Sequence, residues 1–352
     1  MALDPADKSG TQYGLRQVVE DDLPVILSLL NTGLAETEAT RKTGDFWHWK
    51  HRSSPYGESY VGCATAGEGS ELVALRALMP WSFADASGRT YRAFRPVDTV
   101  TRPDHQRRGL FSTLTKRAIR DLEADGADFI FNTPNEQSRP GYLKMGWEVV
   151  GSLPLYARLT NWTGLGSVLL GKTPQPPHGY ALESWDEFVQ RFSSLERVDL
   201  VRSHEESRPR TGLRSVRSAD FLSWRYGQHP NIDYDVFSQS DGRGKLVGFL
   251  VGRRVRGFRG LPAFLLTELF VQEACQESLH ALVKAFISSR CAAYVVTHVA
   301  KNTIEHEVLE SCRFRRLPTR GYILAARSLS TPVSQLTETD GWDLTLCELE
   351  GI

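Results

Sequence analysis

The sequence predicts an α/β fold with a mixed sheet that occurs twice along the chain. Strand patterns alternate with amphipathic helical patterns, and a β-rich run over 60–101 lies within the first half. Four short patterns then recur in the same order in the second half, which indicates a duplicated domain. The length of 352 residues exceeds the usual size of one domain and agrees with two.

The first copy is predicted to begin with a strand and a helix. Its expected strands are 13–19, 60–65, 71–80, 91–101, 127–132 and 148–151. Acidic residues followed by Pro24 mark the start of the first helix, and the aromatic segment 45–51 predicts a second one. Apolar residues at helical spacing predict a third helix from Leu110 to about Asp125, and a short helix over 142–145 follows.

The duplication rests on four pairs of similar segments. They are 45–51 with 220–226, 99–101 with 269–271, 135–147 with 302–314, and Leu153-Pro154 with Leu317-Pro318. A Gly- and Pro-rich stretch between the two sets is typical of a domain linker. The expected organisation is a polar tail (1–12), a first domain (13–159), a linker (160–178), a second domain (179–328) and a C-terminal tail (329–352), whose alternating pattern suggests a strand.

Composition excludes several classes of protein. Forty-two basic residues balance forty-two acidic ones, which argues against a dedicated nucleic-acid or membrane-surface binder. The five cysteines show neither a CxxC pattern nor the Cys/His spacing of a metal site, so neither a disulfide framework nor a metal is expected. The beginning of the sequence lacks the apolar core of a signal peptide, and we expect a cytoplasmic protein.

The most informative stretch runs from Val97 to Leu114. A β-branched strand leads into an Arg-rich turn with one glycine, Gly109, and then into a helix. This order presents the first N–H groups of a helix together with two or three cations at the end of a strand. It predicts an anion site, for which a pyrophosphate is the best candidate.

This stretch resembles the acyl-CoA-binding motif of the GNAT N-acetyltransferase superfamily, Gln/Arg-x-x-Gly-x-Gly/Ala, which here reads Gln106-Arg107-Arg108-Gly109-Leu110-Phe111. The resemblance implies acetyl-CoA or another acyl-CoA as cosubstrate, no metal, and domains with a mixed, mostly antiparallel twisted sheet flanked by helices. The implied cofactor-binding residues are Val100, Thr101, Gln106, Arg107, Arg108, Gly109, Leu110, Phe111, Ser112 and Asn135. Phe111 departs from the pattern, which has a small residue there.

The segment from Asn135 to Trp147 resembles the strand–helix–strand part that follows in this family. There an asparagine typically binds the CoA arm and a tyrosine protonates the departing thiolate, which places Asn135 and Tyr142 in these roles. A phenol with a pKa near 10 suits proton donation to a thiolate of pKa about 8.5 to 10. An ordinary packing role for Tyr142 against Trp147 is the alternative.

The second copy lacks these features, because Gln272-Glu273-Ala274-Cys275 replaces the Arg-rich turn and Leu309 replaces Tyr142. One CoA site, in the first half, is therefore expected. The first candidate for the general base is Asp98, which strand alternation would place on one face with Val100, opposite Val97, Thr99 and Thr101.

Weaker base candidates and pocket residues complete the site predictions. His48 and His51 come next as bases, followed by Glu348, Glu350 or the carboxylate of Ile352 in the tail. Trp47, Trp49 and Trp81 could line an acceptor pocket, although aromatic clusters more often form core.

The leading hypothesis is an N-acyltransferase that moves an acyl group to the amine of a small molecule by direct attack in a ternary complex. No cysteine or serine stands in a nucleophile motif, so a covalent intermediate is not expected. Two alternatives stay open: a non-catalytic acyl-CoA-binding or scaffolding protein, and an aminoacyl-tRNA-dependent transferase with a similar tandem layout. The balanced charge speaks against the latter.

Overall fold

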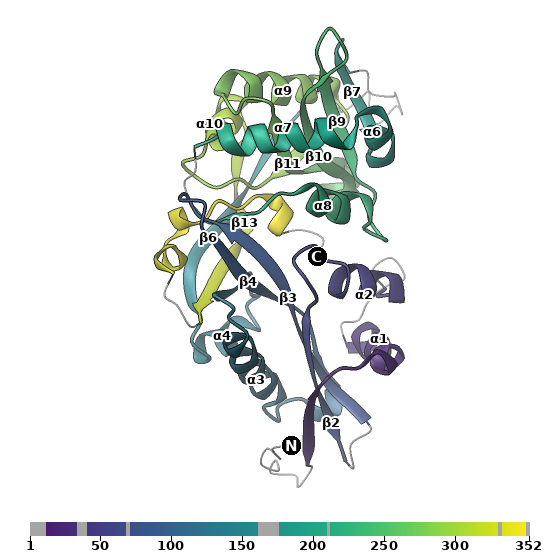
Figure 1. The fold of residues 1–352 in the computed structure, drawn as a ribbon, viewed down its shortest axis with the longest axis vertical. Helices are drawn as coiled ribbons and strands as arrows, with labels where there is room; N and C mark the ends of the chain where they lie inside the picture. Colours follow the sequence, from purple (N-terminus) through teal and green to yellow (C-terminus); the bar gives the residue numbers. More distant parts are fainter. Residues whose placement is uncertain are drawn as a thin grey trace. The chain divides into compact units, whose positions relative to one another are not determined.

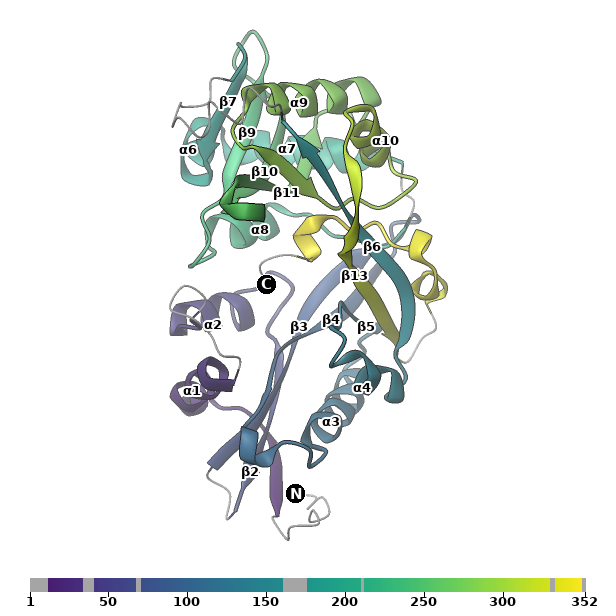
Figure 2. The ribbon, with the colours of Figure 1, turned by 180° about the vertical axis from the view of Figure 1, so that it is seen from behind.

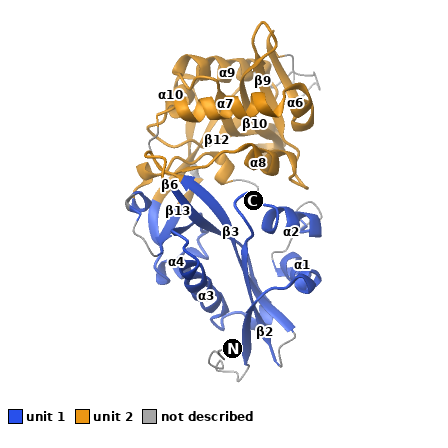
Figure 3. Ribbon diagram, in the orientation of Figure 1, with its two compact units in different colours: residues 1–83, 90–150, 324–337 blue, residues 84–89, 151–323, 338–352 orange. Residues whose placement is uncertain are grey.

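The computed structural model describes residues 12–33, 41–67, 71–160, 176–209, 212–329 and 333–349. The chain forms two compact units, each made of separate segments (Figure 3). Unit 1 contains residues 1–83, 90–150 and 324–337, and unit 2 contains 84–89, 151–323 and 338–352. Most of the expected linker lies outside the described residues.

Unit 1 confirms the predicted order of strands and helices. Its elements are β1 (Tyr13–Gln17), η1 (Glu20–Asp22), α1 (Leu23–Gly33), α2 (Gly44–His51), β2 (Tyr60–Ala66), β3 (Glu71–Ala84), β4 (Thr90–Thr101), η3 (Pro103–His105), α3 (Leu110–Ala124), β5 (Phe129–Asn132), α4 (Arg139–Lys144), the start of β6 (Glu148–Leu159) and the end of β13 (Arg315–Ser328). The strand order is β1-β2-β3-β4-β5-β13. Figure 1 shows α1 and α2 on one side of this sheet and α3 and α4 on the other.

Two core layers hold these helices on the sheet. Ile26 and Leu30 of α1 pack with Leu75 of β3 on one face. On the opposite face, Ile119 of α3 packs with Ile130 of β5. The alternation of β3 therefore sends residue 75 toward α1 and its neighbour, residue 76, toward α3 and α4.

The central strands β4 and β5 separate partway along their length. They pair in parallel only at Ala93 with Phe129 and at Phe94 with Ile130, although β4 continues to Thr101. On its other side β5 stays paired, because Asn132 lies opposite Ala325 of β13. The carboxyl ends of β4 and β5 thus leave an unpaired strand edge between them, where backbone groups can bind an extended ligand.

Unit 2 repeats this arrangement (Figure 2). Its elements are the end of β6, β7 (Tyr180–Ser184), α6 (Trp185–Arg191), α7 (Ser194–Ser207), β8 (Arg214–Ser215), α8 (Ala219–Leu222), the π-helical turn η4 (Ser223–Gly227), β9 (Asp235–Ser240), β10 (Leu246–Arg256), η5 (Phe258–Gly260), β11 (Pro262–Val271), α9 (Gln276–Ser289), β12 (Tyr294–Thr297), α10 (Ile304–Ser311) and the start of β13. The strand order is β6-β12-β11-β10-β9-β7.

The parallel pair of unit 2 also separates. β11 pairs with β12 from Ala263 to Leu266 and then continues alone to Val271. In both units the other described strand pairs are antiparallel, as in β1 with β2 and β10 with β11. The mixed, mostly antiparallel sheet predicted from the sequence is therefore confirmed.

Each unit takes its last strand from the other half of the sequence. Residues Tyr156 to Leu159 of β6 pair with β12 in unit 2. Residues Ala325 to Ser328 of β13 pair with β5 in unit 1. The predicted strand at the end of the first copy is also longer than expected, because it extends past Gly151 to make these pairs.

The C-terminal tail differs from its expected strand. Residues 339–341 and 346–348 form the short 3-10 turns η7 and η8. The side chains of Thr345 and Glu348 form a capping box that starts η8, which favours a turn over an extended chain. Among the described residues, no helix has the length and apolar character needed to cross a membrane.

Candidate functional site

The turn between β4 and α3 has the geometry of an anion cradle. Arg107 and Gly109 both have positive φ, 61° and 79°, and Gly109 is the N-cap of the 15-residue helix α3. The amides of Leu110, Phe111 and Ser112 form its first turn and therefore have no acceptor within the helix. The turn points these donors and the positive end of the helix dipole at one place, where a phosphate would be stabilised.

Neighbouring side chains fix this turn. Nη1 of Arg108 donates to the hydroxyl oxygen of Tyr13 at 3.1 Å, and this hydroxyl lies 2.8 Å from Nδ1 of His105. Nε2 of Gln106 donates to the carbonyl oxygen of Thr101 at 3.1 Å. Arg107 is exposed, so its charge is available to a ligand. The structure thus brings together all predicted cofactor residues of the turn.

The unpaired end of β4 leads directly into this cradle. Val100 is buried against the α1 core, and Thr101 is partly buried. Both lie beyond Phe94, the last residue of β4 that pairs with β5. A ligand with a phosphate at the cradle would therefore have an open strand edge beside its next, extended part.

Tyr142 lies on the face of the sheet that carries α3. Its ring makes edge contacts with Phe111, at 5.5 Å between centroids, and packs on Trp147 at 5.1 Å. Only 5% of Tyr142 is exposed. The ring of Phe111 also contacts the position of Gly141, so this large residue fills the space between the starts of α3 and α4.

A buried arginine that the sequence analysis missed completes this group. Arg76 of β3 is 0% exposed, and its guanidinium carbon lies 5.2 Å from the ring centroids of both Phe111 and Tyr142. Its Nη1 donates to Oγ1 of Thr99 at 2.5 Å. The signal for Arg76 in the sequence was a single charged residue within the apolar run of β3. Its neighbours Leu75 and Ala77 are also buried.

Asp98 lies in a buried ion pair on the opposite face. Its Oδ2 is 2.7 Å from Nζ of Lys50 and 3.0 Å from Nε2 of His51, both on α2. Burial opposes ionisation of Asp98, but Lys50 and the hydrogen bond from His51 outweigh it and hold its pKa far below the usual range. Burial lowers the pKa of His51.

This pairing bears on the predicted general base. A carboxylate held at so low a pKa is a weak proton acceptor near neutral pH. Asp98 also has a φ of 37°, and this turn in β4 shifts the alternation of the strand: Val97 packs on the same core as Val100, not opposite it as expected. The structure therefore favours Asp98 as the residue that fixes α2 to β4, and its role as a base stays a prediction.

The remaining candidates lie in ordinary surroundings. His48 is exposed, and hydrogen bonds to the carbonyl oxygen of Gly44 and to Glu20 raise its pKa. Asn135 is exposed, and its Oδ1 accepts from the amide of Ser138 before α4. Trp47, Trp49 and Trp81 are all buried core residues.

The corresponding turn of unit 2 has a different environment. The amide of Ala274 donates to Oγ of Ser207 at 2.9 Å, and the amide of Gln272 donates to the carbonyl oxygen of Val247 at 2.9 Å. Glu273 and Glu277 add negative charge that would repel a pyrophosphate. Leu309, at the position of Tyr142, is a buried core residue.

Buried ion pairs fill the separation of β11 and β12. Nη2 of Arg217 lies 2.7 Å from Glu268 of β11 and 2.7 Å from Glu348 of the tail. Arg208 binds Glu305 at 2.7 Å and also Asp343 of the tail. Glu348, a weak base candidate, is thus fully buried in an ion pair, while Glu350 and Ile352 lie outside the described residues.

The tail also lies against the separated strands themselves. η8 packs on β11, and Thr345 forms a β-bridge with Val299 just after β12. Thr345, Leu266 and Thr297 line the narrow pocket that remains there. The place in unit 2 that corresponds to the open strand edge of unit 1 is therefore occupied by this chain.

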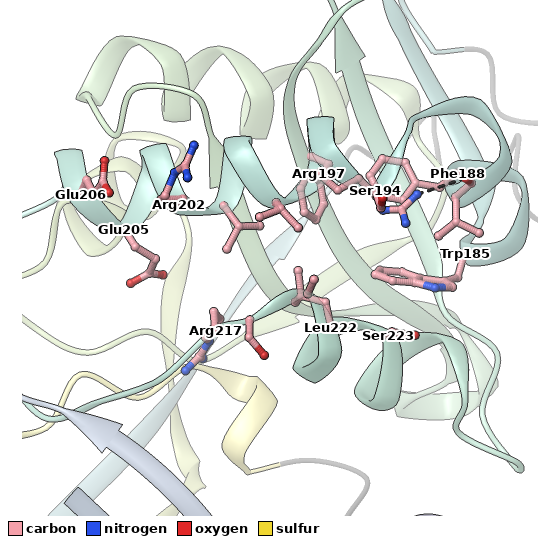
Figure 4. Close-up of a pocket in the computed structure, with 16 residues that line it drawn as sticks. Trp185, Phe188, Ser194, Arg197, Arg202, Glu205, Glu206, Arg217, Leu222 and Ser223 are labelled. Atoms are coloured by element: carbon pink, nitrogen blue, oxygen red, sulfur yellow. Dashed lines mark hydrogen bonds between the residues drawn. The ribbon is translucent and has the colours of Figure 1, made fainter. Parts of the chain in front are cut away.

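Unit 2 also contains a pocket between α7 and α8 (Figure 4). Trp185 and Phe188 line one end, and Glu205 and Arg217 line the other. Both charged residues are engaged in ion pairs, Glu205 with Arg214 and Arg217 with Glu268. Among the described residues, no group of three or more His, Cys, Asp or Glu side chains is arranged to hold a metal ion.

Comparisons with known proteins place this geometry in context. Residues 14–150 match the family model described as an acetyltransferase (GNAT) domain. No curated protein matches the sequence at a significant level. Among solved structures, a probable N-acyltransferase from Enterococcus faecalis is 13% identical with a TM-score of 0.61, over 90% of this chain and 73% of that one.

Two further structures are similar in fold. A GCN5-related N-acetyltransferase from Kribbella flavida is 15% identical with a TM-score of 0.58, over 90% of this chain and 71% of that one. The N-myristoyltransferase of Saccharomyces cerevisiae with bound myristoyl-CoA is 11% identical with a TM-score of 0.57, over 94% and 86%. At these identities the likeness concerns the fold.

Proposed function

We propose that the protein, whose residues 14–150 match the model of an acetyltransferase (GNAT) domain, transfers an acyl group from acyl-CoA to the amine of a small molecule, with acetyl-CoA the first candidate. One observation carries this proposal. The α3 cradle directly follows the open edge of β4 along the chain, and Tyr142 packs against Phe111 in the first turn of α3, so the groups proposed to bind pyrophosphate, pantetheine and thioester lie in one part of unit 1.

The chemistry assigns a role to each part. The cradle amides and Arg107 hold the pyrophosphate, which fixes the thioester beside the end of β4. A neutral amine attacks the thioester carbonyl, and negative charge develops first on the carbonyl oxygen and then on sulfur. Tyr142 donates its proton to the departing thiolate, so that the C–S bond breaks and CoA leaves as the thiol. The proton that the attacking nitrogen loses on becoming an amide returns through solvent to the phenolate of Tyr142.

Unit 2 is proposed to be a copy without a CoA site. Its turn amides are already bonded, its turn is acidic, and its strand separation is occupied by the tail. The buried ion pairs of Arg208 and Arg217 stabilise this closed arrangement only while both partners stay in place.

The test measures CoA binding and CoA release on matched variants of the two turns. Gly109→Val places a β-branched residue at a φ of 79°, which that residue type strongly disfavours, and should weaken CoA binding at least about 10-fold. Ala274→Val, at the corresponding turn of unit 2, should leave CoA affinity unchanged. Release of CoA from acetyl-CoA is then followed with a panel of small amines.

The outcomes separate the candidate functions. Turnover with a small amine, lost in Gly109→Val, supports the proposal. Tight CoA binding without turnover on any amine would favour a non-catalytic acyl-CoA-binding protein. Equal loss of CoA binding in Ala274→Val would show that unit 2 also binds CoA.

A further inference from the structure

Arg76 is the most unusual residue in unit 1 because its charge is buried and only partly satisfied. The side chain has no exposed surface, and only Nη1 has a hydrogen-bond partner, Oγ1 of Thr99. Nε and Nη2 are buried with no partner among the described residues. Leaving such donors unpaired is unfavourable, and the cost is larger for charged groups than for neutral ones.

The two unpaired nitrogens form one edge of the guanidinium. Two other arginines show what this edge binds in the same chain. Nε and Nη2 of Arg208 donate to the two carboxylate oxygens of Glu305 at 3.0 and 2.7 Å, and Arg214 binds Glu205 in the same way at 2.9 Å through each nitrogen. Arg76 thus presents, without a partner, the edge that elsewhere in this protein holds a carboxylate bidentately.

The surroundings of Arg76 place its guanidinium beside the proposed reaction site. Its guanidinium lies against the rings of Phe111, in the first turn of α3, and Tyr142, the proposed proton donor. Thr99, which holds Nη1, lies on the unpaired part of β4. The aromatic faces stabilise a cation but accept no in-plane hydrogen bonds, so they leave the Nε/Nη2 edge unsatisfied.

We propose that Arg76 binds a carboxylate of the substrate and makes the enzyme selective for a substrate that carries one. This inference rests on the proposed acyl transfer, because it concerns the same site. The carboxylate can belong to the acyl group, as in a dicarboxylic acyl-CoA, or to the acceptor, as in an α-amino acid. The chemistry that Arg76 recognises is the same in both.

Phe111 takes part in this arrangement. Its ring covers the guanidinium and is only partly buried, whereas Arg76 and Tyr142 are buried. On this proposal, the Phe111 ring moves aside when a substrate carboxylate binds to Nε and Nη2. Phe111 stands where the family motif has its second small residue. Its large ring therefore has a function on this proposal, because it shields the charge of Arg76 until the substrate arrives.

The experiment measures selectivity as a ratio of kcat/KM values. For the acyl arm, succinyl-CoA is compared with butyryl-CoA, which has the same number of acyl carbons but no carboxylate. For the acceptor arm, α-amino acids are compared with their carboxamides. A charged bidentate hydrogen bond predicts a preference of about 10- to 100-fold in one of the arms.

Two variants test whether Arg76 causes the preference. Arg76→Met should bring the ratio to about one, and Arg76→Lys should recover only part of it because a single ammonium cannot bind bidentately. Arg92→Met is the matched control, because Arg92 is an exposed arginine of β4 paired with Asp125. It should keep the wild-type ratio. Thermal unfolding of each variant checks that the fold is retained.

Binding of the same four ligand types is also measured without turnover. A wild-type ratio near one in both arms, or a ratio that Arg76→Met leaves unchanged, would overturn the role of Arg76. A failure of the proposed function looks different, because then no acyl-CoA releases CoA with any amine, whether or not it binds. The amino-acid arm, measured by calorimetry with and without CoA, still reports on Arg76 in that case.

Discussion

Gly141 lies directly against Phe111: a Cβ at Gly141 would stand 3.0 Å from Cε1 of the Phe111 ring. The two residues compensate each other. The motif carries a large residue where a small one is usual, and the first turn of α4 carries a glycine that makes room for it. The close approach of α3 and α4 therefore depends on this pair.

Gly141→Val should destabilise unit 1 by about 1–3 kcal/mol, because the added methyl groups overlap the Phe111 ring in a packed core. The free energy of unfolding in denaturant measures this effect. Gly44→Ala is the control, since a Cβ at Gly44 in α2 meets nothing within 4 Å. A Gly141→Val protein as stable as Gly44→Ala would contradict the packing role of this pair.

Tyr142→Phe should lower kcat by about 100-fold and leave CoA affinity unchanged, because it removes only the proton that the thiolate receives. Pre-steady-state CoA release and equilibrium CoA binding measure the two quantities separately. Tyr60→Phe is the matched control: Tyr60 packs against the same core, but its hydroxyl donates to Asp121 at 2.7 Å. An unchanged kcat in Tyr142→Phe would remove this residue from the mechanism.

Asp98→Asn should cost about 3–5 kcal/mol of stability, because it leaves the ammonium of Lys50 buried without its counter-charge. Asparagine tolerates the positive φ at this position, so the backbone itself is not strained. Adding Lys50→Met should restore most of the lost stability, as measured by thermal unfolding.

The same double variant decides between the two roles of Asp98. If Asp98 fixes α2 to β4, activity should recover together with stability. If Asp98 is the general base, kcat should stay low over the whole pH range although the protein is folded.

Unit 2 should lose stability as the pH falls from about 6.5 to about 2. Burial lowers the pKa of His204 to about 4, so the unfolded chain binds a proton at His204 more readily, and stability is lost as the pH falls through this range. Burial opposes ionisation of Glu205 and Glu305, but Arg214 and Arg208 outweigh it and lower both pKa values to about 2. The two glutamates therefore contribute to the stability of unit 2 above the ordinary pKa of a glutamate. This contribution is lost as the pH falls from there to about 2.

His204→Gln should therefore flatten the upper part of this profile. The pKa shift of His204 corresponds to a contribution on the order of 3 kcal/mol. Acid unfolding followed by circular dichroism measures it, with the exposed His178→Gln as control. An equal slope between pH 6.5 and 4 in both variants would show that His204 is not the group responsible.

Local patterns predicted most of unit 1 correctly. The apolar spacing of Leu114, Ala118 and Leu122 predicted α3. The glycine at 109, together with the Arg-rich turn, predicted the turn that forms the cradle. These features depend on neighbours in sequence, and periodicity and turn chemistry report on such neighbours.

The missed features depend on contacts between distant residues. The pair of Lys50 and Asp98 joins a helix to a strand 48 positions later, and neither residue has a local signal that names the other. The tail looked like a strand because its residues alternate, but Asp343 and Glu348 meet arginines of unit 2 instead. Arg76 had a local signal, a charge within a buried strand, but its partners Phe111 and Tyr142 come from two later helices.

The exchange of last strands has a consequence for how the protein is made. The β5 edge that pairs with β13 has no partner until residues 325–328 have left the ribosome, more than half the length of the chain later. During synthesis the nascent first half therefore exposes an open strand edge, which can pair with other nascent chains. The emergence of β13, rather than completion of the first half, is the event that allows the sheet of unit 1 to close.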